Sequence, residues 1–177
     1  MNRALPLAWL ALLAGCSETQ AGGDSAVVTP LDAAAIEAGV ITDPDRLDLA
    51  GSFSDTGGTG SDAFCASGNR DAGYKVGVLV TFGASSQCEG RGDAALSGEQ
   101  VRIDLTRNGD GDTMNGCSFA ARFDGNALSL PGSLPGGCAA ACSDRGSLAG
   151  ASFALVEAGQ AAALQQRGRS AARLCAG

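Results

Sequence analysis

The clearest regularity in this chain is an alternation of apolar and polar positions, the pattern of a β-strand with one buried face. Between residues 74 and 82 the apolar side chains that share one face are Tyr74, Val76, Val78, Val80 and Phe82. Small residues at 83–86 predict a turn, and residues 87–94 then predict a partner strand. We therefore expect an antiparallel hairpin here.

The alternation returns further along the chain in shorter runs between glycine-rich breaks. Residues 100–105 place Val, Ile and Leu on one face, and residues 117–123 place Cys, Phe, Ala and Phe on one face. The dipeptide Asp124-Gly125 predicts a tight hairpin into residues 127–130. These segments add three expected strands.

The outer parts of the domain complete this prediction. A first strand is expected over residues 47–53 and a last one over residues 147–156. Thr29 is a favourable N-cap, Pro30 is favourable at the first helical position, and Gly39 is a favourable residue at a helix end. Together they predict a short helix.

The stretch 157–174 is rich in Ala, Gln and Arg and predicts a C-terminal helix, weakened by Gly159 and Gly168. Six to eight short strands with hairpin-length connections predict a mainly β fold, a small antiparallel barrel or sandwich flanked by the two helices. The length accommodates a single domain, expected over residues 29–177.

Cysteine is expected to stabilise this domain, because large apolar side chains are scarce. Leaving Cys16 aside, six cysteines remain: Cys65, Cys88, Cys117, Cys138, Cys142 and Cys175. An even number indicates a disulfide framework if the chain is exported, as the N-terminal features described next predict, and six cysteines allow fifteen pairings. The strand layout favours Cys88 with Cys117, Cys138 with Cys142, and Cys65 with Cys175.

The N-terminus has the features of a secretory signal. Arg3 precedes an apolar run from Ala4 to Leu13, which is shorter than the roughly twenty residues that cross a bilayer as a helix. The run ends in Leu13-Ala14-Gly15-Cys16, which resembles the lipobox of bacterial lipoproteins. That resemblance implies cleavage before Cys16 and acylation of its thiol and its new amine.

The same resemblance implies a signal peptide at residues 1–15 and a lipidated Cys16 followed by a flexible tether through residue 28. Ser17, in place of the Asp that retains enteric lipoproteins in the inner membrane, implies the outer membrane, with the domain facing the periplasm.

Charge and composition exclude several functions. The net charge is −7, and removal of the signal, whose only charge is Arg3, leaves −8. This acidic balance argues against nucleic acid as a partner. The chain has no His, which removes Ser-His-Asp and Cys-His catalysis and most zinc sites. No cofactor is indicated.

One segment invites comparison with a calcium loop. Asn108, Asp110 and Asp112 alternate with glycine, but no register supplies both the glycine and the closing glutamate of the helix-loop-helix calcium motif. We expect a solvated turn, with weak calcium binding as the alternative.

Two function classes remain open. The first is a non-catalytic binding, assembly or inhibitor module of the cell envelope, acting on an envelope protein partner. The second is an envelope hydrolase that works without His, through paired carboxylates or a Ser-Lys site. The only Lys is Lys75, which the alternation places on the solvent face.

Overall fold

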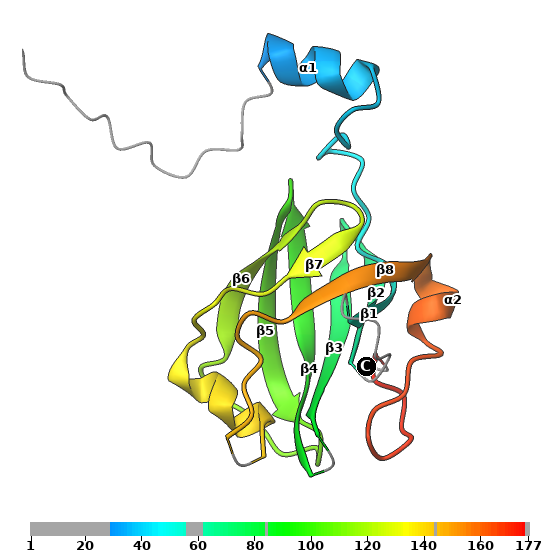
Figure 1. The fold of residues 1–177 in the computed structure, drawn as a ribbon. Helices are drawn as coiled ribbons and strands as arrows, with labels where there is room; N and C mark the ends of the chain where they lie inside the picture. The colour runs from blue at the N-terminus through cyan, green and yellow to red at the C-terminus, as the bar shows by residue number, and fades with distance from the viewer. Residues whose placement is uncertain (1–28, 56–61, 84, 144, 176–177) are drawn as a thin grey trace, which may run out of the picture.

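A closed barrel of eight antiparallel strands dominates the computed structural model, which describes residues 29–55, 62–83, 85–143 and 145–175 (Figure 1). The strands pair in chain order, and the last pairs with the first. They are β1 (Gly51–Asp55), β2 (Ala63–Asn69), β3 (Gly73–Phe82), β4 (Ser86–Ser97), β5 (Gln100–Asn108), β6 (Ser118–Phe123), β7 (Ala127–Ser129) and β8 (Ser152–Ala158). The predicted mainly β fold is confirmed, in its barrel form.

Alternation positions the side chains as expected. In β5 the apolar residues Val101, Ile103 and Leu105 are buried while the polar residues between them are exposed, and β6 shows the same pattern. In β3 the buried face contains Tyr74, and Phe82 at the strand end stays 42% exposed. The interior of the barrel therefore collects the apolar face of each strand.

Aromatic rings occupy the centre of this interior. Phe53, Phe64, Phe123 and Phe153 are each at most 1% exposed. Phe53 contacts Phe64 and Phe123 edge-on, with ring centroids 5.5 and 5.8 Å apart, and the centroids of Phe64 and Phe153 lie 5.9 Å apart. Such offset and edge-to-face contacts stabilise a core beyond the area that they bury.

The segment between α1 and β1 closes one end of the barrel. Leu47 and Leu49, predicted to belong to the first strand, precede β1 and are buried at 5% and 0% exposure. Leu47 lies against Gly125 in the turn between β6 and β7, and the Leu49 amide donates to the Tyr74 hydroxyl. Both leucines therefore reach the core as a plug instead of a paired strand, which corrects the predicted start of β1.

The 3-10 helix η1 (Gly136–Ala141) lies at the opposite end of the barrel and is attached by two disulfides. Cys117 pairs with Cys138, and Cys88 pairs with Cys142. The predictions that joined Cys88 to Cys117 and Cys138 to Cys142 are therefore wrong. Cys88 lies in β4 and Cys117 directly precedes β6, and β5 separates these two strands. Cys138 in η1 and Cys142 at its C-cap each pair with one of them.

The third disulfide, Cys65–Cys175, matches the prediction and holds the C-terminal segment outside the barrel. The predicted helix over 157–174 is wrong except for the single turn α2 (Gln160–Ala163), because β8 continues to Ala158 and Gly159 has φ +102°. Residues 166–175 then cross the outer face of the sheet. We call this segment the strap.

The strap packs onto strand β2, which the pattern analysis did not identify. Cys65, Ala163, Leu174 and Cys175 form a small buried cluster apart from the main core. Leu174 lies so close to Gly77 of β3 that any side chain there would collide with it. β2 is therefore covered on both faces, which removes the alternation that marks a half-buried strand.

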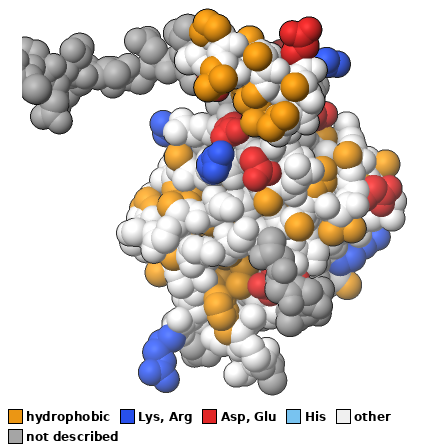
Figure 2. Space-filling view, turned by 45° about the horizontal axis from the view of Figure 1, so that its top comes forward, with side chains coloured by type: hydrophobic (Ala, Val, Ile, Leu, Met, Phe, Trp, Pro, Cys, Tyr) orange, Lys and Arg blue, Asp and Glu red, His pale blue; other side chains and the backbone are white. Residues whose placement is uncertain are grey.

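Helix α1 (Pro30–Glu37) has the predicted capping. The Thr29 hydroxyl accepts from the Asp32 amide, and the Asp32 carboxylate accepts from the Thr29 amide, so both halves of a capping box are present. The Thr29 hydroxyl also donates to the Asp32 carboxylate, at 2.6 Å, and this bond together with the one from the Thr29 amide lowers the pKa of Asp32. The helix buries none of its residues, and apolar side chains are exposed on it and just after it, among them Leu31 and Val40 (Figure 2).

The predicted signal peptide, Cys16 and the predicted tether lie outside the described residues. Within the part of the chain that the structure describes, no helix is both long enough and apolar enough to cross a membrane.

Tyr74 provides a test of the plugged end. Its hydroxyl donates to Asp48 at 2.9 Å, the side chain is 2% exposed, and burial raises its pKa to about 12. An unfolded Tyr ionises near pH 10. The folded pKa is the higher one, so this contribution to stability is complete below pH 10 and is lost between pH 10 and about 12.

Tyr74 is the only Tyr of the chain, so phenolate absorbance reports this residue alone. We expect a midpoint well above that of the urea-unfolded control, accompanied by falling stability. Ionisation of the folded protein near pH 10 would contradict burial of this hydroxyl.

Candidate functional site

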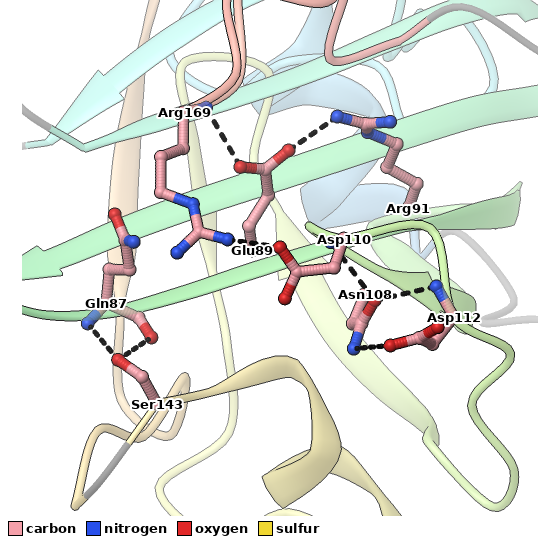
Figure 3. A network of polar contacts seen from close by, with 8 residues as sticks. All are labelled: Gln87, Glu89, Arg91, Asn108, Asp110, Asp112, Ser143 and Arg169. Atoms are coloured by element: carbon pink, nitrogen blue, oxygen red, sulfur yellow. Dashed lines mark hydrogen bonds and ion pairs between the residues drawn. The ribbon is translucent and has the colours of Figure 1, made fainter.

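A polar cleft of about 170 Å³ opens beside η1. Figure 1 shows this short helix at the end of the barrel away from α1. Four segments line the cleft: β4, the turn after β5, the end of η1, and the strap. Their lining residues are Gln87, Glu89, Asn108, Gly109, Asp110, Ala140, Ala141, Cys142, Ser143 and Arg169. The polar side chains among them converge from different segments (Figure 3).

Glu89 is the most buried charge in this cleft. Its neighbours in β4 pair with inward-facing positions of β3, so Glu89 faces outward, yet the overlying strap leaves it only 3% exposed. One carboxylate oxygen accepts from Arg91 Nη2 at 2.6 Å, and the other accepts from the backbone amide of Arg169 at 2.9 Å. A buried carboxylate is costly unless it is paired, and here both oxygens have donors.

Two glycines make room for this carboxylate. A Cβ at Gly109 would lie 2.9 Å from the Glu89 Cβ, and a Cβ at Gly168 would collide with a Glu89 oxygen. The turn after β5 and the strap can approach Glu89 closely because neither carries a side chain at that point.

The guanidinium of Arg169 links the strap to the rest of the cleft. Its Nη2 donates to Asp110 at 2.5 Å. With the Gln87 amide turned so that its oxygen faces the guanidinium, that oxygen accepts from Arg169 Nε at 3.1 Å and from Nη1 at 2.7 Å. Glu89 and Asp110 carry two negative charges, which Arg91 and Arg169 balance.

The calcium candidates form a compact turn. The side-chain oxygen of Asn108 accepts from the backbone amides of Asp110 and Asp112, at 3.1 and 2.9 Å, while Asp110 pairs with Arg169. Asn side chains commonly stabilise turns in this way. Among the described residues no group of three or more His, Cys, Asp and Glu is arranged to hold a metal. Weak calcium binding at these positions stays a prediction.

Lys75 lies elsewhere, on the outer face of β3. It is 55% exposed and pairs with Asp93 of β4 at 2.5 Å. On β3 it is four residues from Leu79, the position opposite Glu89. The structure therefore does not bring the one Lys to the cleft.

Sequence reasoning identified Asn108 and Asp110 but missed Gln87, Glu89 and Arg169. Nothing in β4 marks Glu89 as buried, because an outward-facing glutamate in a strand is ordinarily solvated. Pairing Cys65 with Cys175 correctly placed the chain end on β2. That pairing did not indicate that residues 166–175 cross β3 and reach β4.

The cleft combines accessible and inaccessible groups. The Asp110 side chain is 69% exposed and that of Arg169 is 44% exposed, so both can meet a partner, whereas Glu89 can do so only if the strap moves. The rim of the cleft presents a negative charge on Asp110, a positive charge on Arg169 and the side-chain amide of Gln87. Such a combination suits recognition of a polar protein surface.

Comparisons with protein-family models, with curated proteins and with solved structures found no match to this chain.

Replacement of Glu89 tests whether it fastens the strap. Glu89→Ala leaves the Arg91 guanidinium and the Arg169 amide without their acceptor, and we expect a loss of roughly 1–3 kcal/mol in urea unfolding. Hydrogen exchange at the Arg169 amide should accelerate as well.

Asp110→Asn is the matched control, because it removes an exposed ion pair to the same strap and should cost less than about 1 kcal/mol. Equal losses in the two variants, or unchanged exchange at Arg169 in Glu89→Ala, would show that Glu89 does not hold the strap.

Proposed function

We propose that this protein is a bacterial envelope lipoprotein, fixed to the outer membrane through lipidated Cys16, whose barrel is a non-catalytic binding, assembly or inhibitor module in the periplasm. The observation that carries the proposal is the distribution of its seven cysteines. Six form three disulfides within the domain, and the seventh is the cysteine of the lipobox-like sequence.

The disulfides support export. Such bonds form and persist in oxidising compartments such as the bacterial periplasm and are rare in the cytosol. Here they join η1 to Cys88 and Cys117 and the strap to β2, and these connections attach segments that have little regular structure of their own.

The geometry of the cleft supports binding over catalysis. Phenylalanine rings occupy the barrel interior, so a partner meets the outer surface, and the cleft presents Asp110 and Arg169 there. The cleft is beside η1, at the end of the barrel away from α1, and the predicted tether directly precedes α1 in the sequence. A domain anchored in this way would direct the cleft away from its membrane.

An acidic-site hydrolase is the alternative, because two carboxylates, Glu89 and Asp110, line one cleft. General acid-base chemistry needs both groups within reach of the substrate. Glu89 is 3% exposed and bonded through both oxygens, so this mechanism would require the strap to open first. A Ser-Lys mechanism would have to release Lys75 from Asp93.

Lipidation is tested by Cys16→Ala. We expect incorporation of labelled palmitate into the wild-type protein and none into the variant, because the other six cysteines are oxidised. Labelling that survives the substitution would refute the anchor, whatever the barrel does.

Binding at the cleft is tested by a photo-crosslinking amino acid in place of Ala140, an exposed residue of the cleft. The same group in place of Ala120, exposed on the outer face of β6, is the matched control. We expect a discrete adduct with one envelope protein from position 140 in living cells and none from position 120. The same adducts from both positions, or none from 140, would contradict a binding role for the cleft.

A further inference from the structure

Basic residues are concentrated in the strap of an otherwise acidic protein. The last 33 residues, 145–177, carry four arginines and one glutamate, whereas the mature chain as a whole has a net charge of −8. Three of those arginines, Arg167, Arg169 and Arg173, lie in the strap, and only Arg169 faces the cleft.

The other two arginines lie directly opposite each other. Arg167 and Arg173 form an antiparallel β-bridge. The flanking hydrogen bonds run from the Gly168 amide to the Ala172 carbonyl, at 2.8 Å, and from the Leu174 amide to the Gln166 carbonyl, at 2.9 Å. Arg167 and Arg173 are thus the non-hydrogen-bonded pair between them, the type in which opposite side chains approach most closely, with Cβ atoms about 4.5–5.5 Å apart.

Both guanidinium groups point toward solvent. Gly168 and Leu174 face the barrel, the first against Glu89 and the second against Gly77. Their neighbours Arg167 and Arg173 alternate to the other face, and both are exposed. Within the described ranges neither makes an ion pair, whereas Arg169 pairs with Asp110.

This pairing opposes the local stability of the strap. Like charges directly opposite each other in an antiparallel pair are destabilising. The same turn contains Ala171 at φ +60°, a left-handed conformation that is unfavourable for an Ala. The Cys65–Cys175 disulfide, the Glu89 carboxylate and the packing of Leu174 hold the strap in place despite both costs.

We propose that Arg167 and Arg173 form a binding site for a phosphate group. Guanidinium groups bind phosphate through paired N–H donors, and a bound dianion would remove the repulsion between the two side chains. One guanidinium satisfies both oxygens of a carboxylate, whereas two are matched by the larger number of oxygens on phosphate. The site is separate from the cleft and from lipidation, so it goes beyond the proposed function.

The first experiment titrates inorganic phosphate into the unlipidated mature protein, with its disulfides intact, at low ionic strength. Backbone amide resonances of residues 166–174 should shift along a saturable curve. A double variant, Arg167→Gln with Arg173→Gln, should bind about tenfold more weakly or not at all, since it loses both charge-assisted contacts. Both arginines are exposed and their repulsion is removed, so a urea unfolding midpoint at or above that of the wild type should verify that the variant folds.

The control removes the same total charge elsewhere, through Arg46→Gln with Arg102→Gln. These two arginines are exposed. The cross-strand neighbours of Arg102 are Ala95 and Ala120, so it does not face another charge. The control should bind phosphate as the wild type does. Equal weakening in both double variants, or no saturable shift in the wild type, would overturn the proposal.

A flotation arm identifies the source of the phosphate once the site is established. Vesicles of phosphatidylcholine with phosphatidylglycerol should carry the wild-type protein and not the Arg167→Gln, Arg173→Gln variant if the ligand is a lipid headgroup. Absence of flotation together with saturable phosphate binding would assign the site to a soluble phosphorylated molecule.

Discussion

The pairing of β1 with β8 is the contact on which the rest of this structure depends. It joins Gly51–Asp55 to Ser152–Ala158 and turns an open sheet into a barrel with no free edge. About a hundred residues separate the two strands, so this pairing forms only after a large loss of chain entropy. The phenylalanine contacts that span the interior, among them Phe53 with Phe123, compensate for that loss once the barrel is closed.

Closure of the sheet leaves two open ends, and the chain covers each differently. Residues before β1 plug one end through Leu47 and Leu49, without a covalent bond. At the other end η1 has no large apolar side chain of its own, and disulfides from Cys138 and from its C-cap Cys142 hold it. A small barrel with a limited supply of large apolar residues gains stability from such cross-links because they restrict the unfolded chain.

The candidate site is a consequence of the third disulfide. Cys65–Cys175 brings the strap across β2 and β3, and only then does the Arg169 amide reach Glu89 and its guanidinium reach Asp110. The same arrangement turns Arg167 and Arg173 outward. One cross-link therefore organises both polar surfaces, the cleft under the edge of the strap and the arginine pair above it.

The local pattern alone determined β3, β5, β6 and α1, because alternation and helix capping depend on residues close together in the sequence. It also indicated a six-cysteine framework. Only the tertiary structure decided which cysteines pair, since pairing depends on which strands are neighbours, and β5 separates the two strands of the predicted Cys88–Cys117 bridge. β2, the strap and the burial of Glu89 also depend on coverage by distant residues, and no local periodicity carries that information.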